Sequence, residues 1–137
     1  MHADGPRSAG HLLLGLRALV LLHVVVALAQ AVFAGSFLEG EGSALNLHQV
    51  TGTSIITTVS LLQVIVAGLA WRRRLLPAWF ALMSLLLFLA EMAQIGLGFT
   101  DQLALHVPLG SVIFGTALVL AFAALRHFEA KSLPGKA

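Results

Sequence analysis

Residues 75–99 read LLPAWFALMSLLLFLAEMAQIGLGF, an apolar run with a single ionisable side chain, Glu91. A helix needs about 20 mainly apolar residues to cross roughly 30 Å of hydrocarbon, where only helices and closed barrels satisfy their own backbone hydrogen bonds. This run therefore predicts a transmembrane helix. Three further runs of the same kind predict three more spans: residues 15–37, 47–70 and 103–125.

The composition of the 137-residue chain is that of a membrane protein with one domain. Hydrophobic residues make up 58% of it and charged residues 10%, and the mean hydropathy is +0.94. So few charges cannot cover the surface of a soluble fold. The net charge of +2, without basic residues interleaved with aromatic ones, argues against nucleic-acid binding. Cysteine is absent, which excludes disulfides, thiolate metal sites and a covalently attached c-type haem.

Short polar breaks separate the four runs: EGEGS at 39–43, WRRR at 71–74 and TDQ at 100–102. Short connections of this kind favour antiparallel neighbours. We therefore expect an all-α fold, an integral membrane four-helix up-down bundle that forms a single domain over residues 1–137. Its two parallel helical hairpins would cover about residues 15–70 and 75–127.

Basic residues lie on one predicted side of the membrane only. All eight fall near the chain ends or between the second and third runs: Arg7, Arg17, Arg72, Arg73, Arg74, Arg126, Lys131 and Lys136. The positive-inside rule therefore predicts a multi-pass protein of the cell (plasma) membrane with both termini cytoplasmic. A competing interpretation is a signal peptide cleaved after the ALA at 27–29. We do not favour it, because three spans would then remain, with the termini on opposite sides.

The second and fourth runs open with the same pattern. LNLHQVTGTSI at 45–55 and LALHVPLGSVI at 103–113 both read L-x-L-H-x-x-x-G-x-x-I at an offset of 58 residues, so that His48 matches His106. Two hairpins with the same orientation form a parallel repeat about an axis along the membrane normal. The repeat therefore predicts that both histidines lie at one depth near the outer face, on opposite sides of this axis.

Two imidazoles that face each other at one depth suit the axial ligation of a haem iron, which takes a neutral imidazole nitrogen. The N-terminal end of a helix also disfavours the imidazolium form. Gly52 and Gly110 lie one turn deeper on the histidine face, where they would let a macrocycle edge approach the backbone. We therefore expect metal ligation by His48 and His106, with haem b as the cofactor. The alternative is that the histidines are merely interfacial and the glycines only allow close helix packing.

One pattern occurs twice in these four helices. A helix ends with Gln and Gly, a loop follows, and a His lies at the start of the next helix. This pattern resembles one half of haem A synthase and, more broadly, a four-helix membrane protein of the cytochrome b type. Over about residues 19–125, the resemblance implies that His48 and His106 are the axial pair of a b-type haem. That family has eight spans, so the resemblance also implies a homodimer of this chain. Leu45 stands where the family's catalytic half has a glutamate, and the cysteine pair of many members is missing. These departures speak against methyl hydroxylation of haem and leave an enzymatic role open.

Three further polar residues belong to the candidate cofactor site. Gln30 and Gln94 lie near the ends of the first and third runs, before the two histidines. Glu91 is the only acid inside a span. In a functional role it would relay a proton or contact a haem edge. In a structural role it would stabilise the bundle by bonding Gln30 or a backbone carbonyl of the first helix. His23 has no histidine partner at its depth, so we expect it to be packed or hydrogen-bonded.

Together these patterns predict a haem b protein that transfers electrons at the outer side of the membrane and exchanges them with a quinone or a redox protein. One alternative is a cofactor-free accessory or assembly subunit of a membrane complex, in which the repeat records a duplication. Another is capture of copper or a different metal by the same histidine pair, which would need additional ligands. The sequence has no nucleophile–base pair, carboxylate cluster or phosphate loop, so we expect no catalytic residues.

Overall fold

The computed structural model describes residues 6–132 of the chain, and the side chains of residues 8–126. Its elements are all helical: α1 (Pro6–Leu38), α2 (Gly42–Val50), η1 (Thr51–Ile56), α3 (Thr57–Arg72), α4 (Ala78–Phe99) and α5 (Leu103–Ser132). The π-helix η1 follows α2 and leads into α3 without a break. Among the basic residues used above for orientation, Lys136 lies outside the described residues, as do the side chains of Arg7 and Lys131.

Four stretches are long and apolar enough to cross a membrane: Ser8–Leu38, Gly42–Arg72, Ala78–Phe99 and Leu103–Arg126. The predicted all-α, four-helix membrane fold is confirmed. The first two stretches begin earlier than the sequence predicts, because a helix continues through polar residues once its first turn has formed. Large apolar side chains such as Leu14 and Val25 expose 62% of their surface, as lipid-facing residues do.

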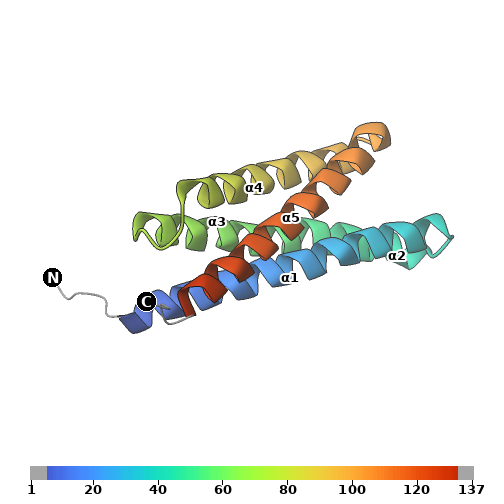
Figure 1. Ribbon diagram of the computed structural model, residues 1–137. Helices are drawn as coiled ribbons and strands as arrows, with labels where there is room; N and C mark the ends of the chain where they lie inside the picture. The colour runs from blue at the N-terminus through green and yellow to red at the C-terminus, as the bar shows by residue number, and fades with distance from the viewer. Residues whose placement is uncertain (1–5, 133–137) are drawn as a thin grey trace.

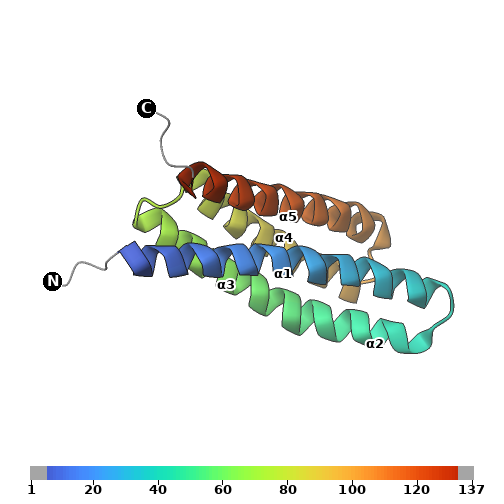
Figure 2. The ribbon, with the colours of Figure 1, turned by 60° about the horizontal axis from the view of Figure 1, so that its bottom comes forward.

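Consecutive spans run antiparallel, and the start of α1, the end of α5 and the α3–α4 turn lie at one end of the bundle (Figures 1 and 2). α1 packs against α3 and α5, and α4 packs against the same two helices. The four spans therefore form a square in which α1 lies diagonally opposite α4, and α3 opposite α5. No close backbone contact crosses either diagonal within the described residues. Contact between diagonally opposite helices is therefore made by side chains.

All three turns between the spans use the same helix ending. A residue with positive φ follows each helix: Gly40 at 103°, Arg74 at 57° and Asp101 at 54°. The N–H of this residue donates to the carbonyl three residues back, and the next N–H donates to the carbonyl five residues back, the two bonds of a Schellman motif. This ending stops a helix and reverses the chain within a few residues, which explains the antiparallel order.

The tightest apolar packing lies in the half of the bundle nearest the α3–α4 turn. Leu16, Ala67 and Ala70 are fully buried there, and Phe80 is almost so. Small alanines allow neighbouring helices to approach closely in a membrane, where packing rather than water drives association. The buried apolar core continues along α5 as far as Ile113, and half-buried Leu109 packs against it. Beyond it, toward the α1–α2 and α4–α5 turns, lies the histidine pair.

Candidate functional site

His48 on α2 and His106 on α5 lie beside each other across one diagonal of the bundle. Their ring centroids are 6.1 Å apart, and the ring planes are tilted by 58°. Both residues are half-buried. The structure therefore brings together the two matched histidines at a place where only side chains connect the second and fourth spans.

Each histidine ring is held by the helix that precedes it. His48 Nδ1 lies 3.0 Å from the backbone carbonyl oxygen of Gln30, and His106 Nδ1 lies 3.0 Å from that of Gln94. A carbonyl oxygen can only accept, so Nδ1 carries the proton in both rings. In the neutral ring the lone pair is then on Nε2, the usual ligating atom when Nδ1–H is bonded to a carbonyl. Neither Nε2 atom has a hydrogen-bond partner among the described residues.

The two glutamine side chains fold over the histidine-bearing helices at the two glycines. Gln30 Nε2 donates to Thr51 Oγ1. Gln94 Nε2 donates over 2.8 Å to the backbone carbonyl oxygen of His106. A Cβ on Gly52 would lie 3.1 Å from Gln30 Oε1, and one on Gly110 would lie 2.9 Å from Gln94 Nε2. An amide group therefore occupies the space beside each glycine.

Both histidine-bearing helices depart from the regular α pattern just after the histidine. The π-helix η1 begins three residues after His48, and Pro108 lies two residues after His106 inside α5. A π-turn widens the helix, and proline removes one N–H from the hydrogen-bond ladder. The His106 ring also packs on Gly98, where an added Cβ would lie 3.1 Å from Cε1. Irregular turns of this kind are frequent at functional sites.

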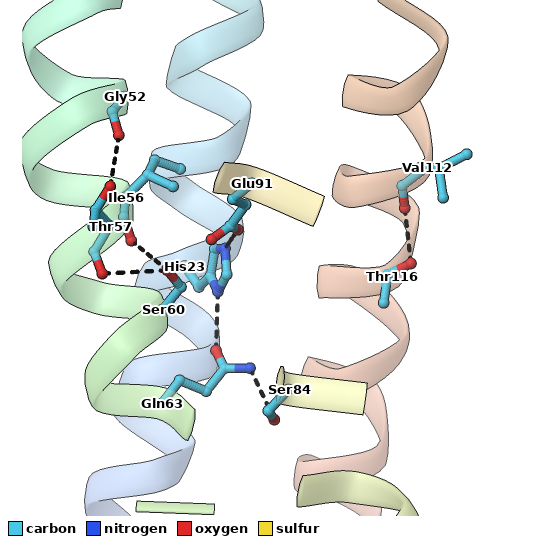
Figure 3. A network of polar contacts seen from close by, with 10 residues as sticks. All are labelled: His23, Gly52, Ile56, Thr57, Ser60, Gln63, Ser84, Glu91, Val112 and Thr116. Atoms are coloured by element: carbon cyan, nitrogen blue, oxygen red, sulfur yellow. Dashed lines mark hydrogen bonds and ion pairs between the residues drawn. The ribbon is translucent and has the colours of Figure 1, made fainter. Parts of the chain in front are cut away.

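A second polar cluster lies deeper in the bundle, since His23 precedes Gln30 by seven residues, about 10 Å along α1. His23 Nε2 lies 2.5 Å from Glu91 Oε1, and its Nδ1 lies 3.0 Å from Gln63 Oε1 (Figure 3). The Gln63 amide donates in turn to Ser84 Oγ over 3.3 Å. All four residues of this second cluster are at most 2% exposed. His23 and Glu91 thus connect α1 with α4 across the other diagonal.

The hydrogen bonds define how many protons the second cluster holds. Because Gln63 Oε1 accepts, His23 Nδ1 carries a proton. The contact between His23 Nε2 and Glu91 Oε1 needs one more, in an imidazolium or in a carboxylic acid. In both forms the pair has no net charge, which lowers the free-energy cost of burying it in hydrocarbon. Glu91 Oε2 and Gln94 Oε1 are buried without a hydrogen-bond partner in the described part of the chain.

The structure gathers six of the seven sequence-predicted site residues around the histidine pair: His48, His106, Gln30, Gln94, Gly52 and Gly110. Glu91 bonds His23 rather than Gln30, and the Gln30 amide donates its hydrogen bond to Thr51. Sequence reasoning missed this pairing, although two ionisable groups that are each costly in a bilayer are a signal for it. It also missed the glutamine carbonyls as ring supports, since every residue carries a carbonyl.

We expect Glu91→Ala to lower the free energy of unfolding by about 1–3 kcal/mol, because it leaves His23 Nε2 buried without a partner. Glu91→Gln retains a donor for that nitrogen and should lose clearly less. Unfolding from mild detergent by added SDS, followed by circular dichroism, measures both changes. Glu39→Ala, at an exposed position in the α1–α2 turn, is the matched control and should be neutral. Equal losses for the two Glu91 variants would show that the pair does not stabilise the bundle.

We expect Gly110→Ala to destabilise the bundle relative to Gly115→Ala by about 1–2 kcal/mol. The new Cβ would lie 2.9 Å from Gln94 Nε2, so the amide must move and give up its bond to the His106 carbonyl. Nothing lies within 4 Å of a Cβ at Gly115, where alanine gains only helix propensity. The same SDS titration compares the two variants. Coincident unfolding curves would contradict the role assigned to Gly110.

No family model, curated protein or solved structure matches this chain. The side chains of its two polar sites carry the chemistry of this chain. That chemistry consists of two adjacent imidazoles with available Nε2 atoms, and of a neutral histidine–carboxyl pair deeper in the same bundle.

Proposed function

We propose that this chain is an integral membrane protein that binds haem b between His48 and His106 and transfers electrons near the outer face of the membrane. The observation that carries the proposal is the pair of histidine rings, 6.1 Å apart and each oriented by a backbone carbonyl. The four membrane spans supply the apolar surroundings that a haem macrocycle needs.

The separation of the rings fits a shared iron atom. Metal–imidazole bonds are about 2 Å long, so a metal atom held by both Nε2 atoms would require ring centres within roughly 6 Å of each other. The observed 6.1 Å agrees with this distance. The Nδ1–H contacts to Gln30 and Gln94 leave Nε2 as the ligating atom of both rings, and such contacts also make the ligand more basic.

Two imidazole ligands suit an iron whose other four ligands come from a porphyrin. A bare copper or zinc ion usually takes three or four protein ligands. Within the described residues, no group of three or more His, Cys, Asp or Glu side chains is placed to hold a metal ion. The geometry therefore favours haem over metal capture. Bound haem would supply reversible one-electron chemistry, and His48 and His106 would hold it.

The charge distribution supports an outer-face location. The Arg72–Arg74 turn lies at the opposite end of the bundle from the α1–α2 and α4–α5 turns, next to which the histidines lie (Figure 1). With both termini cytoplasmic in the plasma membrane, a quinone or a redox protein is the class of partner that reaches such a site. The resemblance to one half of haem A synthase supports assembly of two copies into an eight-span homodimer.

Protein purified in mild detergent from haem-replete cells should show a Soret band and sharp reduced α and β bands, because two axial imidazoles make the iron low-spin. His48→Ala and His106→Ala should each abolish the low-spin spectrum. A pyridine haemochrome assay identifies the haem as b-type and gives its amount per chain.

His11→Ala is the matched control for these variants, since His11 is exposed near the start of α1. Its spectrum should equal that of the unchanged protein. A well-folded, haem-free preparation that also fails to take up added haemin would exclude the proposed function and favour the cofactor-free accessory subunit.

Because the chain has no cysteine, single introduced cysteines report the orientation directly. Glu41→Cys should react with a membrane-impermeant maleimide applied to spheroplasts, whereas Arg72→Cys should react only after the membrane is permeabilised. Both positions are exposed and lie at opposite ends of the second span. The reverse labelling pattern would place the histidine pair at the cytoplasmic face.

A further inference from the structure

The His23–Glu91 pair takes no part in holding the proposed haem, yet it buries two ionisable groups that are 1% and 2% exposed. One Glu91 oxygen, Oε1, bonds His23. The other, Oε2, is buried and has no hydrogen-bond partner among the described residues. Oε2 can therefore accept a further proton or hydrogen bond.

We propose that the His23–Glu91 pair is a proton-uptake site: Glu91 Oε2 takes up one proton when one electron reaches the site formed by His48 and His106. This inference rests on the proposed haem function. The electron comes from an external one-electron donor and the proton from water, so Fe(III) becomes Fe(II) and one O–H bond forms. The pair then holds three protons in place of two, as an imidazolium beside a carboxylic acid, and its charge rises from zero to +1.

The physical reason is charge compensation in a medium of low dielectric constant. Charges interact strongly there, so an added electron raises the proton affinity of a nearby group. Glu91 precedes Gln94 by three residues, about 5 Å along α4. The Gln94 carbonyl in turn bonds His106 Nδ1. The proton site therefore lies about one helical turn from the support of an axial ligand.

Gln94 Oε1 is a second buried oxygen close to Glu91 in the sequence. It is buried without a partner among the described residues, like Glu91 Oε2, and the two side chains lie three residues apart on one face of α4. A water molecule has two O–H donors, and buried waters characteristically satisfy such otherwise unpaired atoms. One water that donates to both oxygens would link Glu91 to the amide beside His106.

The side chains that bond to the pair are neutral: Gln63 contacts His23 directly, and Ser84 contacts Gln63. On α1, the nearest other titratable side chain in sequence is Arg17, six residues before His23. The remaining described titratable side chains on the helices around the pair are His11, His48, Arg72, His106 and Arg126. α4 itself carries no titratable side chain besides Glu91. Proton uptake at this depth is therefore assigned to His23 and Glu91.

Redox titration of the haem-loaded full chain in detergent, repeated from mildly acidic to mildly alkaline pH, tests the inference. Because a proton is taken up on reduction, the midpoint potential should fall as pH rises, by up to about 59 mV for each tenfold change in proton concentration. Glu91→Gln should flatten this dependence while the Soret and α bands remain. Glu39→Gln makes the same chemical change at an exposed position and should leave the slope unaltered.

A midpoint potential that does not depend on pH in the unchanged protein would overturn the inference. So would a slope that persists in Glu91→Gln, because the proton would then be taken up elsewhere, for example on the haem propionates. Both results require a normal haem spectrum. A chain without any Soret band would instead overturn the proposed function, so the two failures are distinguishable.

Infrared difference spectra, reduced minus oxidised, provide a readout that needs no variant. The unchanged protein, labelled with carboxyl-¹³C glutamate, should show a redox-linked change in the C=O band of a protonated glutamic acid, and this band should shift in D₂O. Labelling separates it from the haem propionates. If Glu91→Gln fails to bind haem, this measurement decides alone, and a spectrum without such a band contradicts the inference.

Discussion

A polar side chain inside a bilayer has to find its partner within the protein, because hydrocarbon offers neither donors nor acceptors. In this bundle His23 and Glu91 meet that constraint across one diagonal of the square, between α1 and α4. His48 and His106 lie beside each other across the other diagonal, and each bonds a backbone carbonyl of the preceding helix. Since no close backbone contact crosses the diagonals within the described residues, side chains alone connect these helices.

The hydrogen bonds of the ring nitrogens separate the two histidine sites chemically. Both ring nitrogens of His23 have protein partners, so neither is available to a further ligand. His48 and His106 use only Nδ1, each bonding a backbone carbonyl, and their Nε2 atoms have no such partner in the described chain. A ring held in that way presents a lone pair in a defined direction, which is what ligation requires. The two histidine sites therefore differ in which ring nitrogens are bonded within the protein.

The repeated L-x-L-H-x-x-x-G-x-x-I pattern was sufficient to select His48 and His106, because a fixed offset relates the two positions without any knowledge of helix packing. The glutamines were harder to match. Gln30 precedes His48 by 18 residues and Gln94 precedes His106 by 12, so the two matched glutamines differ by six residues in their spacing from the histidines. The sequence also suggested open space beside the glycines, whereas amide side chains occupy it.

The sequence by itself determined that this chain forms four membrane helices, because hydropathy is a local property that adds up along each run. Only the tertiary structure decided that Glu91 bonds His23, that Gln30 and Gln94 hold the histidine rings through their carbonyls, and which oxygens stay unpaired. A hydrogen-bond partner depends on the rotation of each helix about its own axis and on the depth at which helices meet. Neither quantity is encoded in the composition of a single run.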